Sequence, residues 1–287
     1  MRTRILNKMR NCEVEQYLDN GGDTIFIAVG TVELHGDFPL DCETVCIEAI
    51  CEKMAKAANG LAMTGLPFFY PGATRIGRGT VYMSIQDGVN YLSKISDSLL
   101  QQGFRKQIYV TGHGPAYLSV NTHIMDAFHR HSVPFVHISL IQAINIAREN
   151  GWEGNLGSYS QMMYGAYKQL NQLNYLYVDA DARQIDSLLK SNSPQDSTMG
   201  SISYLQRLAT TPGNVGFYYE NFSEHGGGEG CRTIEQLHQK AENGEKLIDS
   251  FIHYFNPQKV VDAIEDIDRK TQEIILEKYP HLRGGVK

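Results

Sequence analysis

The sequence has no apolar run approaching the roughly eighteen residues that a membrane-spanning helix needs. Its first residues are basic, but no apolar core of a signal peptide follows them. It also has no excess of basic residues, because the net charge is −6, and this argues against a nucleic-acid-binding protein. We therefore expect no nucleic-acid partner and no membrane partner.

Cysteine is scarce and shows no pairing pattern. The five cysteines are odd in number and include no Cys-x-x-Cys pair, which predicts free thiols in a reducing environment, so we expect a cytoplasmic protein. Cys42, Cys46 and Cys51 lie close together in the sequence, so a thiolate metal site is an alternative. We favour a helix that turns Cys46 and Cys51 toward the core.

Apolar residues make up 42% of the 287 residues, enough for the core of one large domain, and we expect a single domain over residues 1–287. As far as residue 140, short β-rich runs alternate with helical patterns. This alternation predicts an α/β fold with a mainly parallel sheet. The expected strands are 24–30, 61–67, 107–111 and 134–140, and the expected helices are 8–20, 44–57, 87–102 and 117–131. Beyond them we expect a mostly helical stretch at about 141–210, interrupted by a polar break at 191–197, and C-terminal helices at 233–255 and 258–278.

Acidic and imidazole side chains follow the first predicted strand. Glu33 and His35 are two residues apart, a spacing that puts both side chains on one face of an extended chain. Asp41 and Glu43 follow with the same spacing. Because ligands bind at the carboxyl ends of strands in open α/β sheets, this group predicts a divalent metal site for Zn²⁺ or Mn²⁺. A solvated loop is the alternative.

Two more segments carry the same kinds of side chain. The apolar run 107–111 ends in glycine and His113, which brings a second imidazole to the predicted sheet edge. Further on, Glu224, His225 and Glu229 lie in a glycine-rich stretch whose backbone can approach a ligand closely. A glycine loop without chemistry is the alternative for this third segment.

These segments resemble the creatininase (creatinine amidohydrolase) family of metal-dependent hydrolases. The family opens with a strand, then Gly-Ser-x-Glu-x-His-Gly and Pro-Leu-x-Thr-Asp, which are matched here by residues 30–36 and 39–43. Its Asn-Gly-His-Gly and Glu-His-Ala-Gly-Glu motifs are matched by residues 111–114 and by residues 224–229. The resemblance runs from about residue 25 to residue 235. It implies a three-layer αβα sandwich with a mainly parallel sheet.

The resemblance also implies a site and a reaction. One or two divalent ions, Zn²⁺ or Mn²⁺, activate a water that attacks a carbonyl carbon of the substrate. His225, oriented by Glu224, carries the proton to the leaving group. Glu43 takes the place of the family's bridging Asp, and Asp41 is the alternative carboxylate. The implied metal ligands are Glu33, His35, Glu43 and His113, with Glu229 as a further candidate.

Departures from the family pattern bear on the substrate. Some members have a metal-binding Glu where this chain has Pro115, and Glu229 is a candidate replacement. The only tryptophan, Trp152, lies well before residue 224, so the aromatic wall of creatininases is not evident and we do not expect creatinine itself. Residues 42–44 are most similar to a branch that includes keto-inositol (3-dehydro-scyllo-inosose) hydrolases. The expected substrate is a small cyclic amide or cyclic polyhydroxy ketone.

Other residues are weaker candidates. Arg78, in an arginine- and glycine-containing loop, is a candidate substrate-binding residue, with a solvated loop as the alternative. Tyr117, after the second glycine–histidine turn, is a candidate lining residue or an ordinary core tyrosine. His123 and His131 have no supporting motif, and we expect them on or near a helix surface without a role.

Two other functions remain open. One is a metal-dependent isomerase or lyase of a polyhydroxy ketone, and the other is a metabolite-binding protein without catalytic activity. The resemblance further implies a homo-oligomer, most often a hexamer built from dimers. Apolar positions in the C-terminal helices and in the stretch 141–210 are in keeping with such an assembly.

Overall fold

The computed structural model describes residues 1–36, 38–176, 178, 197–209, 213–219 and 230–283. At its centre lies a parallel sheet of four strands in the order β2-β1-β3-β4, with β1 and β3 in the middle. This arrangement confirms the predicted α/β class. The strands are β1 (Thr24–Val29), β2 (Leu61–Leu66), β3 (Lys106–Thr111) and β4 (Val136–Ser139).

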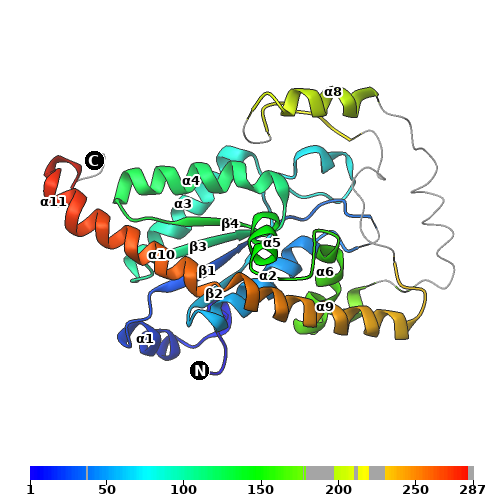
Figure 1. Cartoon of the computed structure of the whole chain (residues 1–287), viewed down its shortest axis with the longest axis horizontal. Coiled ribbons are helices and arrows are strands. Elements are labelled where there is room, and N and C mark those ends of the chain that lie inside the picture. Colours follow the sequence, from blue (N-terminus) through cyan, green and yellow to red (C-terminus); the bar gives the residue numbers. More distant parts are fainter. Residues whose placement is uncertain (37, 177, 179–196, 210–212, 220–229, 284–287) are drawn as a thin grey trace.

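Helices cover both faces of the sheet (Figure 1), which confirms the predicted three-layer arrangement. The N-terminal and first crossover helices are α1 (Asn11–Asp19), α2 (Cys42–Ala57), α3 (Ile85–Gln101) and α4 (Tyr117–His131). The later ones are α5 (Leu140–Glu149), α6 (Ser158–Gln169), α8 (Ser197–Gln206), α9 (Ile234–Phe255), α10 (Gln258–Arg269) and α11 (Leu276–Lys278).

The alternation of side chains along β1 divides the core in two. Phe26 and Ala28 face the layer that contains α2, α6 and α9, whereas Ile25 and Ile27 face α3 and α4. All six residues of β1 are buried, as expected for an interior strand covered on both sides. The carboxyl ends of the parallel strands therefore meet at one edge of a sheet whose two faces are filled.

The predicted boundaries differ from the observed ones in a few places. Helix α2 begins at Cys42, two residues before the predicted start. The predicted strand 134–140 is shorter, because α5 starts directly at Leu140. A π-helical stretch, Lys270–Ile275, interrupts the predicted helix 258–278. Most of the predicted polar break at 191–197 lies outside the described residues.

The cysteines behave as predicted. All five are free, and Cys42, Cys46 and Cys51 are buried on α2. Burial raises the pKa of Cys46 well above its ordinary value, so the group stays a neutral thiol. The group of potential metal ligands in the described part of the chain contains no cysteine, which argues against the alternative of a thiolate metal site. Among the described residues, no helix is both long and apolar enough to cross a membrane.

Helices α6 and α9 cross at two glycines. A Cβ on Gly165 would lie 2.2 Å from the carbonyl carbon of Gly244, and one on Gly244 would lie 2.0 Å from the backbone oxygen of Gln161. The two backbones are therefore in direct contact. This crossing holds α9 against the layer that carries α2.

Substitution of Gly244 by alanine should destabilise the protein by about 2 kcal/mol or more. Overpacking costs about 1–3 kcal/mol, and the obstacle here is backbone, which cannot move aside as a flexible side chain can. The better helix propensity of alanine, about 1 kcal/mol, offsets only part of this cost. Denaturant unfolding of Gly244→Ala would measure the loss. Gly216→Ala is the control, since nothing lies within 4 Å of a Cβ there, and its free energy of unfolding should hardly change.

The expectation that His123 lies on or near a helix surface is wrong. Its side chain is fully buried between α4 and the sheet, with Nε2 3.1 Å from the Tyr109 hydroxyl and Nδ1 3.2 Å from Ser93 Oγ. Burial lowers the pKa of His123 to about 4. The ring is therefore neutral near pH 7, and it is a structural part of the core.

Stability should fall in a defined pH window because of His123. Its folded-state pKa lies below the ordinary 6.5, so the unfolded chain binds a proton more readily. The contribution of neutral His123 to the free energy of unfolding is intact above pH 6.5. It is lost progressively as the pH falls toward 4, by on the order of 3 kcal/mol in total. Unfolding free energies of wild type and His123→Gln, compared from pH 7 to pH 4, should converge as the pH falls. A constant difference between the two would contradict this assignment.

Candidate metal centre and adjoining cleft

The end of β1 and the start of α2 lie in direct contact. A Cβ on Gly30 would come within 2.1 Å of Thr44 Oγ1, so only glycine permits this approach. The Thr44 hydroxyl donates to the backbone oxygen of Thr31 at 2.7 Å, and the backbone N–H of Glu33 donates to Leu40 at 2.8 Å. These contacts close the loop between β1 and α2 over the carboxyl edge of the sheet.

Three predicted ligands meet at this edge. Ligand atoms of Glu33, Glu43 and His113 all lie within 4.8 Å of one another, and all three residues are buried. His113 Nδ1 is 2.6 Å from Glu33 Oε1 and 3.0 Å from Glu43 Oε2. Thus the loop after β1, the first turn of α2 and the end of β3 each supply one group, as the sequence predicted for the two strand ends.

His35 approaches the cluster from the other side of Glu43. Its Nε2 lies 3.5 Å from Glu43 Oε1, the oxygen that does not face His113. The Glu43 carboxylate consequently lies between two imidazoles, one at each oxygen. A carboxylate in this position would be able to hold an ion at either oxygen.

Hydroxyl groups fix both carboxylates. Thr31 Oγ1 donates to Glu43 Oε2 at 3.2 Å, and Tyr159, from α6, donates to Oε1 at 3.4 Å. Thr74 Oγ1 donates to Glu33 Oε2 in a short hydrogen bond. Sequence reasoning missed these three residues. Thr31 stands at the serine position of the Gly-Ser-x-Glu-x-His-Gly motif, but no sequence pattern marks Thr74 or Tyr159.

The cluster is electrostatically coupled. Burial disfavours a charge on His113, but the adjacent carboxylates of Glu33 and Glu43 outweigh it and raise the pKa of His113 to about 10. Burial also opposes ionisation of Glu43, yet hydrogen bonds from His113 and His35 hold its pKa well below the ordinary range. Burial raises the pKa of Glu33, with His113 opposing the rise. The site thus stabilises a positive charge between its two carboxylates.

Asp41, the alternative to Glu43, lies outside this cluster. It precedes the first turn of α2, and its Oδ1 accepts a hydrogen bond of 2.8 Å from the Tyr167 hydroxyl. The carboxylate that reaches His113 is that of Glu43. The side chain of Glu43 is longer than that of the aspartate in the family pattern. It fits this position, since it lies close to both imidazoles.

A cleft of about 770 Å³ adjoins the cluster. His113 and Thr74 form part of its wall, together with Tyr117, which the sequence marked as a candidate lining residue. Pro115 also lines it. Arg78 is exposed and does not belong to the lining, so the structure does not bring it to the cleft. Glu224, His225 and Glu229 lie outside the described residues.

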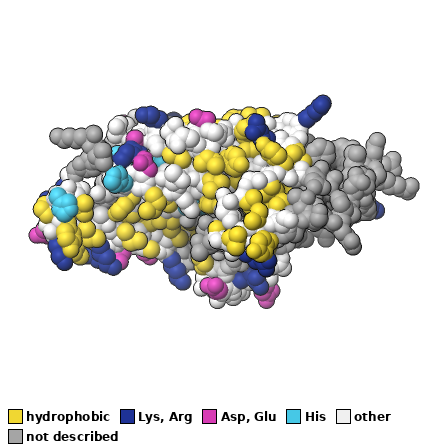
Figure 2. All heavy atoms as spheres, turned by 90° about the horizontal axis from the view of Figure 1, so that it is seen from above, with side chains coloured by type: hydrophobic (Ala, Val, Ile, Leu, Met, Phe, Trp, Pro, Cys, Tyr) yellow, Lys and Arg dark blue, Asp and Glu magenta, His cyan; other side chains and the backbone are white. Residues whose placement is uncertain are grey.

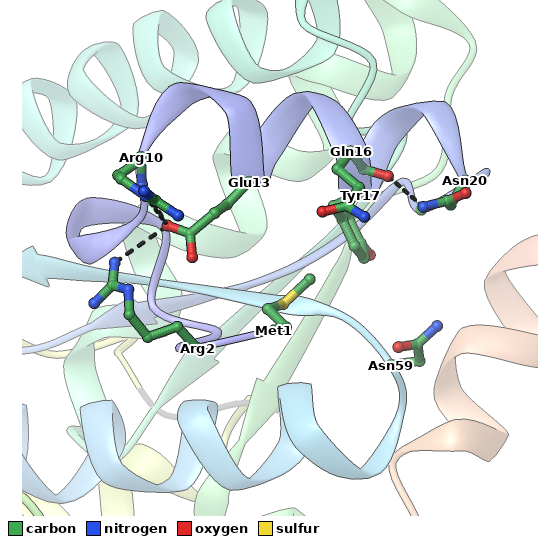
Figure 3. A pocket seen from close by; sticks show the side chains of 9 residues that line it. Met1, Arg2, Arg10, Glu13, Gln16, Tyr17, Asn20 and Asn59 are labelled. Atoms are coloured by element: carbon green, nitrogen blue, oxygen red, sulfur yellow. Dashed lines mark hydrogen bonds and ion pairs between the residues drawn. The ribbon is translucent and has the colours of Figure 1, made fainter.

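A second depression lies beside α1, away from the predicted residues (Figure 3). Its two arginines converge on one carboxylate, with Arg2 Nη2 at 3.2 Å and Arg10 Nε at 3.5 Å from Glu13 Oε2. Backbone and side-chain hydrogen bonds lower the pKa of Glu13 to about 2. The arginines are therefore engaged within the pocket, and the metal-ligand cluster remains the candidate site.

Solved structures of creatininases share this fold. One creatinine amidohydrolase (creatininase) has a TM-score of 0.54 and 15% identity, covering 90% of this chain and 99% of that one. A mutant creatininase in complex with creatine has a TM-score of 0.56 at 15% identity, covering 92% and 98%. A mutant of Zn-Zn type has a TM-score of 0.51, also at 15% identity, with 90% and 100% covered. At identities this low, the comparison shows a likeness of fold alone.

Sequence comparison identifies the family. No curated protein matches the chain. The model of the creatininase family, described as creatinine amidohydrolase, matches residues 7–173, more than half of the 287 residues. This range contains β1 to β4, the loop after β1 and all three members of the buried cluster. The chain therefore belongs to the creatininase family of metal-dependent amidohydrolases.

Proposed function

We propose that this protein hydrolyses a small cyclic substrate with the help of one or two divalent cations, Zn²⁺ or Mn²⁺. The observation that carries the proposal is the position of His113, which belongs both to the buried acidic cluster and to the wall of the cleft. A substrate in the cleft would therefore lie against one of the proposed metal ligands. The proposed ligands are Glu33, His35, Glu43 and His113.

The residues present fit such cations. Two carboxylates and an imidazole are a donor set that both Zn²⁺ and Mn²⁺ accept, and solved creatininases include a Zn-Zn form and a Mn form. The raised pKa of His113 supports the same reading, because it reflects a position where positive charge is stabilised. When bound, a cation of this kind lowers the pKa of water toward about 7 and polarises a carbonyl group.

The protein groups have separate tasks in this proposal. Glu43 lies between the two imidazoles and would be the ligand that two ions share if two are bound. Thr31 and Tyr159 hold its oxygens, and Thr74 holds Glu33, so that these carboxylates keep their orientation during the reaction. His225, with Glu224 beside it in sequence, delivers a proton to the leaving group. Glu229 is the proposed replacement for the carboxylate that Pro115 lacks.

Two measurements test the proposal together. Elemental analysis of the purified protein should give one or two equivalents of zinc or manganese per chain. Turnover in H₂¹⁸O should place ¹⁸O in the product, because the attacking oxygen comes from water. Metal-dependent turnover without ¹⁸O would instead identify an isomerase or lyase, and a chain that takes up no metal would identify a binding protein.

We also propose that the chain forms a homo-oligomer. Figure 2, which looks onto the side carrying α4 and α8, shows apolar side chains gathered over that face. Met125 on α4 and Leu208 just after α8 are each 67% exposed, and Tyr204 is 58% exposed. Burial of such a surface against another copy would be favourable. Light scattering that gives a monomer near 32 kDa would contradict this.

A further inference from the structure

A second histidine faces the cleft that adjoins the metal ligands. His137, on β4, lines this cleft together with His113. No sequence motif marks His137, and the proposed reaction gives it no task. Both of its ring nitrogens are nevertheless engaged, since Nε2 lies 2.8 Å from Thr111 Oγ1 and Nδ1 lies 2.8 Å from Asn121 Oδ1. The ring is therefore held in one orientation by groups from two other elements, β3 and α4.

The two partners determine where the proton of His137 lies. An amide oxygen can only accept a hydrogen bond, so Nδ1 carries the proton and donates to Asn121 Oδ1. Nε2 is then the acceptor, and the Thr111 hydroxyl donates to it. Burial lowers the pKa of His137 to about 4, which keeps the ring neutral near neutral pH. The direction of both hydrogen bonds is thus fixed.

The sheet anchors one end of this array. Thr111 is the last residue of β3, it is buried, and it pairs with Ser139 of β4. His137 lies two residues before Ser139, so its side chain projects from the same face of the sheet as that of Thr111. The register of two parallel strands therefore sets the position of the imidazole before any ligand enters the cleft.

The other end of the array is open to the cleft. Asn121, on α4, is exposed and also lines the cleft. Because its Oδ1 accepts from His137, its Nδ2 with two N–H groups faces away from the ring. Among the described residues, no group accepts a hydrogen bond from Nδ2. Two donors in the wall of the cleft are therefore available to a bound molecule.

We propose that His137 is a positioning residue, which holds Asn121 so that its N–H groups donate to an oxygen of the bound substrate. The proposal rests on the hydrolytic function proposed above and assigns one contact of that substrate. The oxygen belongs to a carbonyl or hydroxyl group other than the one that reacts beside the metal ligands. An amide that is already held loses less conformational freedom on binding than a free one, so the array favours a substrate with a second oxygen at this position.

NMR spectroscopy of His137 tests the orientation of the amide without any ligand. Long-range ¹H–¹⁵N correlation spectra distinguish a ring protonated at Nδ1 from one protonated at Nε2, and the missing signals of His137→Gln assign the ring. We expect the Nδ1–H form in the wild type. In the Nε2–H form, Nδ1 would accept from the N–H group of Asn121, which would turn the amide oxygen toward the cleft. That result would overturn the proposal.

Two probes that differ by one carbonyl oxygen test the contact on the metal-loaded protein. Glutarimide has two ring carbonyls and 2-piperidone has one, so the ratio of their dissociation constants measures the effect of the second oxygen. Calorimetric titration gives both constants. The advantage of glutarimide should shrink about fivefold in Asn121→Asp, which corresponds to about 1 kcal/mol. Aspartate still accepts from His137, but it has no N–H group to donate.

Asn90→Asp is the matched control for the added charge. Asn90 is an exposed helical asparagine whose Oδ1 likewise accepts a hydrogen bond, from Gln86 Nε2 at 3.1 Å, but it does not line the cleft. The same substitution there should leave the ratio of the two constants unchanged. An equal loss in both variants would trace the effect to charge and overturn the contact.

Two variants of His137 separate positioning from a general structural role. His137→Leu keeps the Asn121 amide but removes its anchor, so most of the advantage of glutarimide should disappear while the constant for 2-piperidone hardly changes. His137→Gln should restore much of the advantage, because its amide can donate to Asn121 and accept from Thr111. Equal weakening of both probes by His137→Leu would show a structural role alone and overturn the proposal.

These outcomes are distinct from those that test the proposed function. If glutarimide does not bind the wild type, or if its advantage is unchanged in Asn121→Asp, the contact is overturned even where turnover places ¹⁸O in the product. If the advantage falls as expected but no ¹⁸O enters the product, the contact stands and the hydrolytic function is overturned.

Discussion

Replacement of Glu43 by glutamine should reduce turnover by orders of magnitude while the fold stays intact. Each carboxylate oxygen of Glu43 faces a different imidazole, His113 at 3.0 Å and His35 at 3.5 Å. Glutamine keeps the size of the side chain but replaces one oxygen by an NH₂ group. This group cannot bind a cation, and its N–H groups cannot accept a hydrogen bond from Thr31, Tyr159 or a protonated imidazole. Steady-state kinetics measures the effect, and circular dichroism checks that the variant is folded.

Two further variants control this result. Glu43→Asp keeps the charge and should be milder than glutamine, although the shorter arm has to reach both imidazoles. Asp41→Asn should matter much less, since Asp41 accepts its hydrogen bond from Tyr167 outside the cluster. If Asp41→Asn proved the more damaging change, Asp41 would be the ligand and the assignment of Glu43 would be wrong.

The sequence predicted most helices and strands because strands and helices have different patterns of apolar residues in this chain. β1 and β3 are fully or almost fully buried, so they read as continuous apolar runs, and the helices between them repeat their apolar residues at helical spacing. The same alternation predicted which ends of the strands meet. Glu33 and His113 are eighty residues apart in sequence but 2.6 Å apart in space, and parallel pairing of β1 with β3 is what brings them together.

Packing partners across the fold could not be predicted in the same way. Tyr159 reaches Glu43 from α6, and Thr74 reaches Glu33 from a short 3-10 helix, contacts that depend on tertiary packing with no local pattern. His123 was misplaced because a histidine in a helix resembles a solvated residue until its partners are known. Here those partners, Tyr109 and Ser93, come from β3 and α3 and satisfy both ring nitrogens in the core.

Removal of one imidazole should cost the protein at least one metal ion. His113 is buried between two carboxylates, and His35 lies against the far oxygen of one of them. Elemental analysis of His113→Ala and His35→Ala should each show a loss of at least one ion per chain relative to wild type. The control is His131→Ala, because His131 Nε2 lies 2.8 Å from Asp97 Oδ1, outside the cluster. That variant should keep its full metal content.

The same variants should also lose the stabilisation that the metal provides. A ligand that binds only the folded state raises the free energy of unfolding by RT ln(1 + [L]/Kd), about 2.7 kcal/mol when the free metal is at a hundred times its Kd. Addition of EDTA should therefore lower the Tm of wild type and of His131→Ala. The Tm of His113→Ala should respond little, because most of the effect is already lost. A His113→Ala protein with wild-type metal content and a wild-type response to EDTA would show that the ion binds elsewhere. The buried acidic cluster would then need another explanation for its two converging carboxylates.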